Sequence, residues 1–331
     1  VVAYVYTDIL EFAGPVQGAL REVFGWSSKR DYWFPEIRSL GGAITMMTLV
    51  LYPYVYLLSR AAFLEQSVGV FEASRSLGRG PWRSFFTVAL PLARPAIIIG
   101  LYLVLMETLN DYGTVDFFAV NTFSLGIFDV WMNMNNVSGA AQLATVMLVF
   151  VAVLVLGERY ARRKQRFHNT STKMQPLPGF PLSGALRYLA TAGCLLPILL
   201  GFVLPTLVLL AYAHRHYDAE LTAEILGHAG NSVKLSVLAG AIAVVIAIVM
   251  TYGARIKGGP LLTAANRIAA MGYAIPGAVL AVGVLVVLGG LDNSIDDFAR
   301  RHFGLSTGLL FSGTIAAVTF GYLVRFLALS L

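Results

Sequence analysis

Residues 232–252 read SVKLSVLAGAIAVVIAIVMTY and contain one charged side chain, that of Lys234. An α-helix needs about 20 mostly apolar residues to cross the hydrocarbon core of a bilayer, so this stretch predicts a membrane-spanning helix. Six comparable stretches, and one shorter stretch at the start of the chain, extend the prediction to an all-α, polytopic membrane protein. They lie near residues 1–10 (the shorter one), 40–63, 94–109, 140–157, 186–212, 268–288 and 309–329.

The composition agrees with this class. Of 331 residues, 57% are hydrophobic and 13% are charged, and the mean hydropathy is +0.71. In soluble domains, by contrast, roughly a quarter of all residues are charged. The net charge of +6 is concentrated in short loops, so it is read as membrane topology and not as affinity for nucleic acid. The single cysteine, Cys194, cannot form an intrachain disulfide.

Basic residues orient the spans. Cytoplasmic loops of membrane proteins carry an excess of Lys and Arg, and alternating spans place three basic clusters of this chain on the same side. We therefore expect that side to be the cytoplasm. The clusters are Arg75, Arg79 and Arg83; Arg159, Arg162, Arg163, Lys164 and Arg166; and Arg255, Lys257 and Arg267.

Residues 159–185 divide the chain into two parts. They are basic, then polar, then rich in Pro and Gly, which is typical of a flexible tether on the cytoplasmic side. Residues 2–6 weakly resemble residues 280–284, and residues 54–60 resemble residues 322–328, with the same membrane orientation in both copies. This indicates a parallel duplication. The chain begins without Met and starts and stops inside apolar runs, so we expect it to be a piece of a longer protein.

The connection at residues 64–95 carries the most specific signal. Leu64, Val68 and Phe71 follow the i, i+4, i+7 spacing of one apolar helix face. Gly78 permits a tight turn, and Pro81 suits the first turn of a following helix. The sequence therefore predicts a helix, a turn and a second helix that leads into the membrane. Such an element can insert an apolar ridge into a partner's groove while its charges set the orientation.

Residues 72–78 read EASRSLG, and after nine further residues, residues 88–91 read VALP. This stretch resembles the EAA loop of ABC importer permeases, whose pattern is E-A-A, three residues, G, nine residues, I-x-L-P. Ser74 and Val88 are conservative departures from Ala and Ile. The resemblance implies that the loop contacts an ATPase subunit, with Arg75 and Arg79 beside the motif in the contact. An amphipathic loop lying on the membrane surface is the alternative. Five positions match the pattern at the right spacing, namely Glu72, Ala73, Gly78, Leu90 and Pro91.

The chain as a whole resembles fused permeases of the ferric-iron type. The resemblance implies a type I ABC importer (MetI-like) transmembrane fold with parallel duplicated halves, each with its own EAA loop. Residues 1–158 would be the C-terminal part of the first half, and residues 186–331 the N-terminal part of the second. Ferric iron is then the expected substrate, with thiamine, phosphonate, sulfate and polyamine as alternatives.

The same resemblance implies partners and a location. It implies a multi-pass protein of the cell inner membrane, a cytoplasmic ABC ATPase dimer and a periplasmic or lipoprotein substrate-binding protein. The two helix sets would alternate between outward-open and inward-open states. The sequence has no G-x-x-x-x-G-K-[ST] motif, so ATP is expected to be used by the partner. The chain itself is expected to be no enzyme and to bind no cofactor and no metal.

Two groups are candidates for the transport pathway. Glu107, near Asp111 at the outer end of its span, could attract a cation or could mark the water boundary. Tyr52 and Tyr56 share one face of a span, and could line a path or pack in the core. His214 and His216 have the spacing of a metal pair but lack further clustered ligands, so we interpret them as interfacial.

Two other classes of membrane protein are alternatives to a permease. An ion-coupled secondary transporter would need ionisable residues inside its spans, which are few here. A membrane-embedded enzyme would need paired acids or a nucleophile deep in the membrane, and neither is evident.

Residues 131–136, with one Trp and two Met, favour an outer loop over a soft-metal site. Arg325, near an inner helix end, is expected to extend toward the interface.

Overall fold

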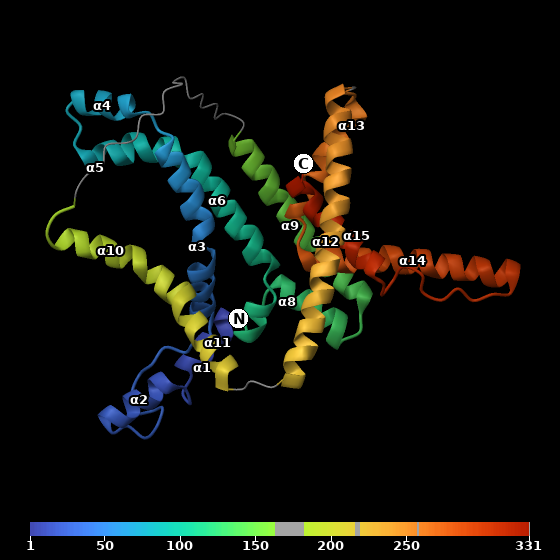
Figure 1. Cartoon of the computed structure of the whole chain (residues 1–331), viewed down its shortest axis with the longest axis horizontal. Coiled ribbons are helices and arrows are strands. Elements are labelled where there is room, and N and C mark those ends of the chain that lie inside the picture. Colours follow the sequence, from blue (N-terminus) through green and yellow to red (C-terminus); the bar gives the residue numbers. More distant parts are fainter. Residues whose placement is uncertain (163–181, 216–218, 257, 331) are drawn as a thin grey trace. The chain divides into compact units, whose positions relative to one another are not determined.

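The computed structural model describes residues 1–162, 182–215, 219–256 and 258–330. Within these ranges every regular element is a helix (Figure 1). Six helices are long and apolar enough to cross a membrane by length and composition, and a seventh apolar helix is shorter. The predicted all-α, multi-span fold is therefore confirmed. The six are Leu40–Leu64, Pro81–Asn110, Val137–Gly157, Ala185–Arg215, Thr222–Ile256 and Gly277–Phe303, and the shorter one is Ile315–Ala328.

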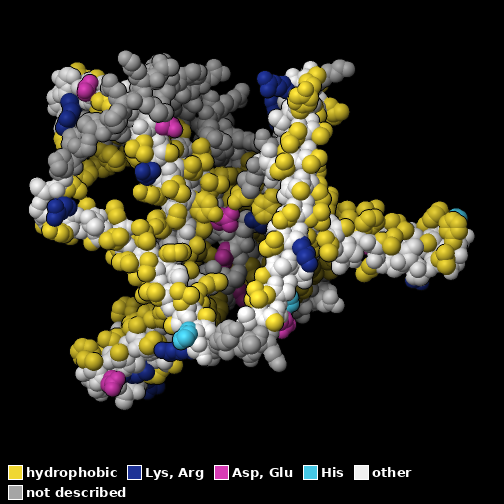
Figure 2. Space-filling model, viewed as in Figure 1, with side chains coloured by type: hydrophobic (Ala, Val, Ile, Leu, Met, Phe, Trp, Pro, Cys, Tyr) yellow, Lys and Arg dark blue, Asp and Glu magenta, His cyan; other side chains and the backbone are white. Residues whose placement is uncertain are grey.

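The spans expose large apolar side chains to their surroundings. Hydrophobic side chains cover the visible surfaces of α10, α12 and α14 in Figure 2. On α12 (Ala219–Ile256), for example, Val237, Val245 and Val249 are all more than half exposed. A water-soluble helix would turn such side chains toward a core, whereas a lipid-facing helix has no reason to hide them. This exposure is what a membrane-spanning chain requires.

The helices group into two compact units, Val1–Asn121 with Leu156–His216 and Thr122–Val155 with Tyr217–Leu331. Helix α9 (Val137–Arg162) contributes to both. Most of the predicted tether at residues 159–185 lies outside the described residues.

The first unit is built around α3 (Leu40–Leu64) and α6 (Leu90–Asn110). The two helices pack closely at Gly100, where a Cβ atom would lie 2.8 Å from the Cα of Val55. Near the start of α3, Ala43 and Met46 form a buried cluster with Tyr6 and other residues. The unit's remaining helices are α1 (Val2–Leu10), α2 (Pro15–Phe24), α4 (Val68–Ser76), α5 (Pro81–Ser84), the π-helical turn η1 (Phe85–Ala89), α7 (Gly113–Phe117), α10 (Ala185–Ile198), the π-helical turn η3 (Leu199–Val203) and α11 (Leu204–Arg215).

Helices from beyond the predicted tether pack inside this first unit. The Tyr6 hydroxyl of α1 donates a 2.6 Å hydrogen bond to the carbonyl of Leu200 in η3. The Tyr212 hydroxyl of α11 donates to the carboxylate of Asp8 in α1. The span formed by α10, η3 and α11 therefore belongs in space with the helices at the start of the chain.

The second unit contains α8 (Phe123–Phe128), the π-helical turn η2 (Asp129–Asn133), α12, α13 (Pro260–Ala269), the 3-10 turn η4 (Gly272–Ala274), α14 (Gly277–Phe303) and α15 (Ile315–Ser330). Helix α12 packs against α15. Its Ala239, Ala243 and Ala247 are buried at intervals of four residues. Small residues at this spacing let membrane helices approach closely.

The structure moves the last two predicted spans. The span expected near 268–288 is broken before Gly277: Ile275 is extended, because the residue before a proline is disfavoured in the α region, and Pro276 caps α14. The span expected near 309–329 begins at Ile315. The preceding residues form an irregular loop with left-handed backbone at Gly304, Gly308 and Gly313.

Candidate functional site

Residues 64–95 form the predicted helix–turn–helix. Helix α3 ends at Leu64, α4 and α5 follow as two short helices in contact with each other, and η1 continues into α6 (Figure 1). At the turn, Gly78 has φ +76° and its N–H donates to the carbonyl of Arg75 at 2.9 Å. That left-handed conformation is strained for any residue with a Cβ atom, which explains the glycine at this position.

Buried hydrogen bonds hold the two arms together. The hydroxyls of Ser74 in α4 and Ser84 in α5 lie 2.8 Å apart, and both residues are at most 5% exposed. Closer to the membrane helices, the Nε2 of Gln66 donates to the carbonyl of Ala89 at 2.8 Å. Because buried polar groups are costly unless they are paired, these contacts favour one arrangement of the arms.

A third contact lies near the turn. The guanidinium Nη1 of Arg79 donates to the hydroxyl of Thr87 at 2.9 Å, and the Thr87 hydroxyl donates to the carbonyl of Arg83 at 2.6 Å. The N–H of Arg79 also donates to the carbonyl of Ser74 at 3.2 Å. Arg79 therefore ties the turn to both arms and is only partly exposed.

The outer surface of the element combines apolar and charged side chains. Leu77 at the turn is 78% exposed and Trp82 is 76% exposed, and the Trp82 ring stacks on Phe86 with centroids 6.4 Å apart. Glu72 on α4 and Arg83 on α5 are exposed charged residues of the same element. An exposed apolar ridge bordered by charges is the surface expected of a docking element.

The structure separates the residues predicted from the motif into two groups. Glu72, Ala73, Arg75 and Gly78 are exposed on α4 and the turn. Ser74 is buried between the arms, and Leu90 and Pro91 are partly buried in the first turn of α6. The first group presents surface, and the second joins the element to its own span. Leu64, expected on the apolar face, is 55% exposed.

Sequence reasoning missed two residues of this element, Gln66 and Ser84. Both are polar and buried, and both bond to a group on the other arm. A polar residue within an apolar face was the available signal, but the partner of each could only be seen in the folded chain.

The predicted pathway residues do not gather at one place. Within the first unit, Glu107 and Asp111 line a cavity of about 440 Å³ together with Tyr54. Asp111 also accepts hydrogen bonds from the N–H groups of Thr114 and Val115 at 2.8 and 3.1 Å, so it stabilises the first turn of α7, whose N-cap residue is Tyr112. The cavity lining does not include Tyr52 or Tyr56. A pathway role for Glu107, Tyr52 and Tyr56 stays a prediction.

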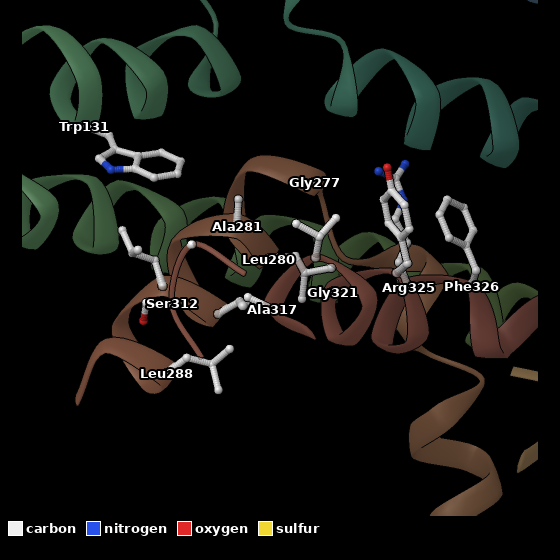
Figure 3. A pocket seen from close by; sticks show the side chains of 15 residues that line it. Trp131, Gly277, Leu280, Ala281, Leu288, Ser312, Ala317, Gly321, Arg325 and Phe326 are labelled. Carbon is white, nitrogen blue, oxygen red and sulfur yellow. The ribbon is translucent and has the colours of Figure 1, made fainter. Parts of the chain in front are cut away.

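The second unit has a cavity of about 340 Å³ between α14 and α15 (Figure 3). Its lining is apolar, with Leu280 and Ala281 from α14 and the indole of Trp131 at one side. Arg325 lines it as well: its Nε is buried with no hydrogen-bond partner among the described residues. Its guanidinium carbon lies 5.5 Å from the centre of the Phe326 ring, an arrangement in which the aromatic face partly compensates the charge.

Metal-binding groups do not cluster in the part of the chain that the structure describes, where no three His, Cys, Asp or Glu side chains come together. His214 lies in the last turn of α11, and the other half of the predicted pair, His216, lies outside the described residues.

Comparison with known families identifies the segment that carries this site. Residues 32–166 match the family described as "Binding-protein-dependent transport system inner membrane component". The matched segment contains the whole helix–turn–helix and the spans on both sides of it. A component of this kind is neither catalytic nor a carrier of a cofactor, which agrees with the two predictions made for the chain.

Individual relatives are distant. The chain is 27% identical over 249 residues to the "Fe(3+)-transport system permease protein FbpB 2" of Haemophilus influenzae, which covers 74% of this chain and 49% of that protein. It is 28% identical to the "Molybdenum transport system permease protein ModB" of Escherichia coli K12, covering 38% of this chain and 57% of that protein.

A third relative is the "Putative 2-aminoethylphosphonate transport system permease protein PhnU" of Salmonella paratyphi A. It is 28% identical and covers 45% of this chain and 51% of that protein. The chain thus spans about half the length of the curated relatives it matches. No solved structure matches it.

Proposed function

We propose, because residues 32–166 match the family described as an inner membrane component of a binding-protein-dependent transport system, that this chain is part of the permease of an ABC importer. The observation that carries the proposal is the position of the motif: Glu72, Ala73 and Gly78 lie exposed on a braced helix–turn–helix that continues directly into a span. When a partner bound to such an element moves, the element can transmit that movement to the membrane helices.

The coupling surface would work through two kinds of contact. Leu77 and Trp82 enter an apolar groove of the ATPase subunit, while Glu72, Arg75 and Arg83 set the orientation through charge complementarity. When the ATPase dimer closes on ATP, the groove carries the helix–turn–helix with it. Helices α3 and α6 follow because they pack closely at Gly100.

The family description supports the wider assembly proposed for this chain. A binding-protein-dependent system includes a substrate-binding protein, which would lie on the periplasmic side or be anchored there as a lipoprotein, and a cytoplasmic ATPase dimer. The inner membrane is the location that the same description gives. Residues 1–158 and 186–331 would belong to two parallel halves joined by the tether at 159–185, and a second coupling loop would belong to the second half.

Ferric iron is the substrate that the comparisons favour. The relative named for Fe(3+) transport matches over 249 residues of this chain, whereas the relatives named for molybdenum and 2-aminoethylphosphonate match over 131 and 152 residues. The longer match includes more of the membrane helices that could line a pathway. An oxyanion such as molybdate is the second candidate, because Arg325 places a cation in an apolar cavity of the second unit.

One experiment tests the proposal. The full-length permease is purified from its native host, and the ATPase that accompanies it is identified. The complex and its binding protein are then reconstituted in liposomes, and uptake of ferric iron, molybdate and 2-aminoethylphosphonate is measured with and without ATP. ATP-dependent uptake of one of these probes is expected. Uptake that continues with an ATPase inactivated by mutation contradicts the importer assignment.

A further inference from the structure

One buried hydrogen bond joins the two ends of the helix–turn–helix at residues 64–95, which we call the coupling element. Gln66 lies in the turn between α3 and α4, and Ala89 is the last residue of η1. These residues are 23 positions apart, and α4, the Gly78 turn and α5 all lie between them. The 2.8 Å bond from the Gln66 Nε2 to the Ala89 carbonyl therefore joins the two ends of the segment that contains α4, the turn and α5.

The backbone that this bond supports is intrinsically weak. Residues Phe85–Ala89 form a π-helical turn, in which the N–H of Leu90 reaches back to the carbonyl of Phe85. Pro91 and Pro95 follow and have no N–H to donate. Such turns and prolines interrupt the hydrogen-bond ladder of a helix and are places where helices bend. Without a brace, a push on the turn at Gly78 would flex this segment instead of moving α6.

Packing alone does not account for a glutamine at this position. Gln66 is 9% exposed, and its Oε1 is buried with no hydrogen-bond partner in the part of the chain that the structure describes. An unpaired buried polar atom costs free energy, which an apolar side chain of similar length, such as methionine, would avoid. The donated bond to Ala89 is the contact that only the amide supplies.

We propose that Gln66 is a positioning residue for energy coupling: its bond to Ala89 makes the helix–turn–helix, α3 and α6 move as one body when the ATPase closes. This inference rests on the proposed function and adds the part of the element that carries force to the spans. It gives Gln66 a role that is separate from ATPase docking, because the residue is buried at the base of the element and Leu77 and Trp82 are exposed.

Spin-label distances test the brace without substrate or ATPase. In the full-length permease with Cys194 and every cysteine outside residues 1–331 replaced by Ser, labels are attached at Leu77→Cys and Leu101→Cys, two exposed positions on the turn and on α6. A narrow distance distribution is expected for the otherwise unchanged protein and a broad one with Gln66→Met. Equal widths in the two proteins would overturn the proposal, and so would a lower thermal unfolding midpoint that accounts for the broadening.

Coupling is measured on the reconstituted complex with whichever of ferric iron, molybdate or 2-aminoethylphosphonate it carries. With Gln66→Met, the ATP hydrolysed per transported substrate is expected to rise about fivefold, the equilibrium change that one net hydrogen bond supports. ATPase binding is expected to stay the same. Ser76→Ala, which removes an exposed bond to the Glu72 carbonyl in the same element, is the matched control and should leave the ratio unchanged.

The outcomes separate the two proposals. If the unchanged complex does not transport, the proposed function fails, and the spin-label distances still decide whether Gln66 stiffens the element. If transport is coupled normally in Gln66→Met, or if ATPase binding falls in step with transport, the positioning role is wrong while the importer assignment stands.

Discussion

The hydroxyl oxygens of Ser74 and Ser84 lie 2.8 Å apart in a buried contact that joins α4 to α5. Ser74 stands at the position where the EAA pattern has a second alanine. Its departure from the pattern thus has a partner ten positions away in the same loop. The pair adds to the hydrogen bonds of Gln66 and Arg79 in the same element, and to aromatic contacts such as that of Phe63 with Phe85, whose ring centroids are 5.9 Å apart.

This pairing predicts non-additive substitutions. Ser84→Ala leaves the Ser74 hydroxyl buried without a partner and should cost about 1–3 kcal/mol of stability, and Ser74→Ala should cost a similar amount. The double variant removes both polar groups, so it should be less destabilised than the sum of the two single variants. Thermal unfolding in detergent and the rate of proteolysis within residues 64–95 measure the effect. Strict additivity would show that the hydroxyls do not interact.

The turn gives a prediction about transport. Gly78 has φ +76°, so Gly78→Asp adds both backbone strain and a negative charge at the exposed tip. We expect Gly78→Asp to abolish uptake while membrane insertion stays normal. Uptake by the reconstituted complex and the membrane-bound amount of protein are the measurements.

The neighbouring glycine provides a control for that variant. Gly80 has φ −67°, and a Cβ atom there would meet nothing within 4 Å. Gly80→Asp therefore adds the same charge two positions away without the strain. It should keep most of the activity. Normal uptake in Gly78→Asp, or equal losses in both variants, would contradict the importance given to the left-handed turn.

The coupling element could be predicted because its signals are local. The motif residues lie within 20 positions, and the helix-forming and turn-forming residues act on their own neighbours, as Gly78 and Pro81 do. The brace was missed because Gln66 and Ala89 meet only when α3 and α6 pack side by side. No periodicity within a single segment reports which buried polar side chain faces which carbonyl.

The second unit shows a different limit. The apolar run near 268–288 is continuous in hydropathy. The break inside it depends on Pro276 and the extended Ile275, a signal that is present in the sequence but weaker than the apolar run.

In the first unit, the packing of α10 and α11 beside α1 depends on Tyr6 and Tyr212, whose partners lie about two hundred positions away. Contacts at that separation are set by the tertiary fold.

The buried carboxylate of Asp292 holds the loop at residues 304–314, so its replacement should destabilise that loop. Asp292 is 0% exposed, and its carboxylate accepts the N–H groups of Leu310, Phe311 and Ser312 at 2.8–3.2 Å. Asp292→Asn replaces an acceptor oxygen with a donor and should destabilise the loop by about 1.5–3 kcal/mol. Amide hydrogen exchange of residues 310–312 should accelerate. Asp297→Asn, an exposed carboxylate on the same helix, should leave the exchange unchanged.

Acidic pH should loosen the turn at residues 27–31. Backbone N–H groups of Ser27 and Ser28 donate to the Asp31 carboxylate at 2.9 and 2.7 Å, and they hold the pKa of Asp31 below its ordinary value of 3.8. A carboxylate whose pKa is lower in the folded state stabilises the fold above pH 3.8. That contribution disappears as the pH falls through the lower folded value.

Trp26 reports the change, because its ring stacks on Tyr32 with centroids 4.7 Å apart. Tryptophan fluorescence should therefore show a step below pH 3.8 that is missing in Asp31→Asn, a variant that is already loosened at neutral pH. Glu36, whose pKa is lowered by its hydrogen bond and attraction to Lys29, titrates nearby. The Glu36→Gln variant separates the two groups: it should retain the Trp26 step, and loss of the step in that variant would assign the transition to Glu36 instead of Asp31.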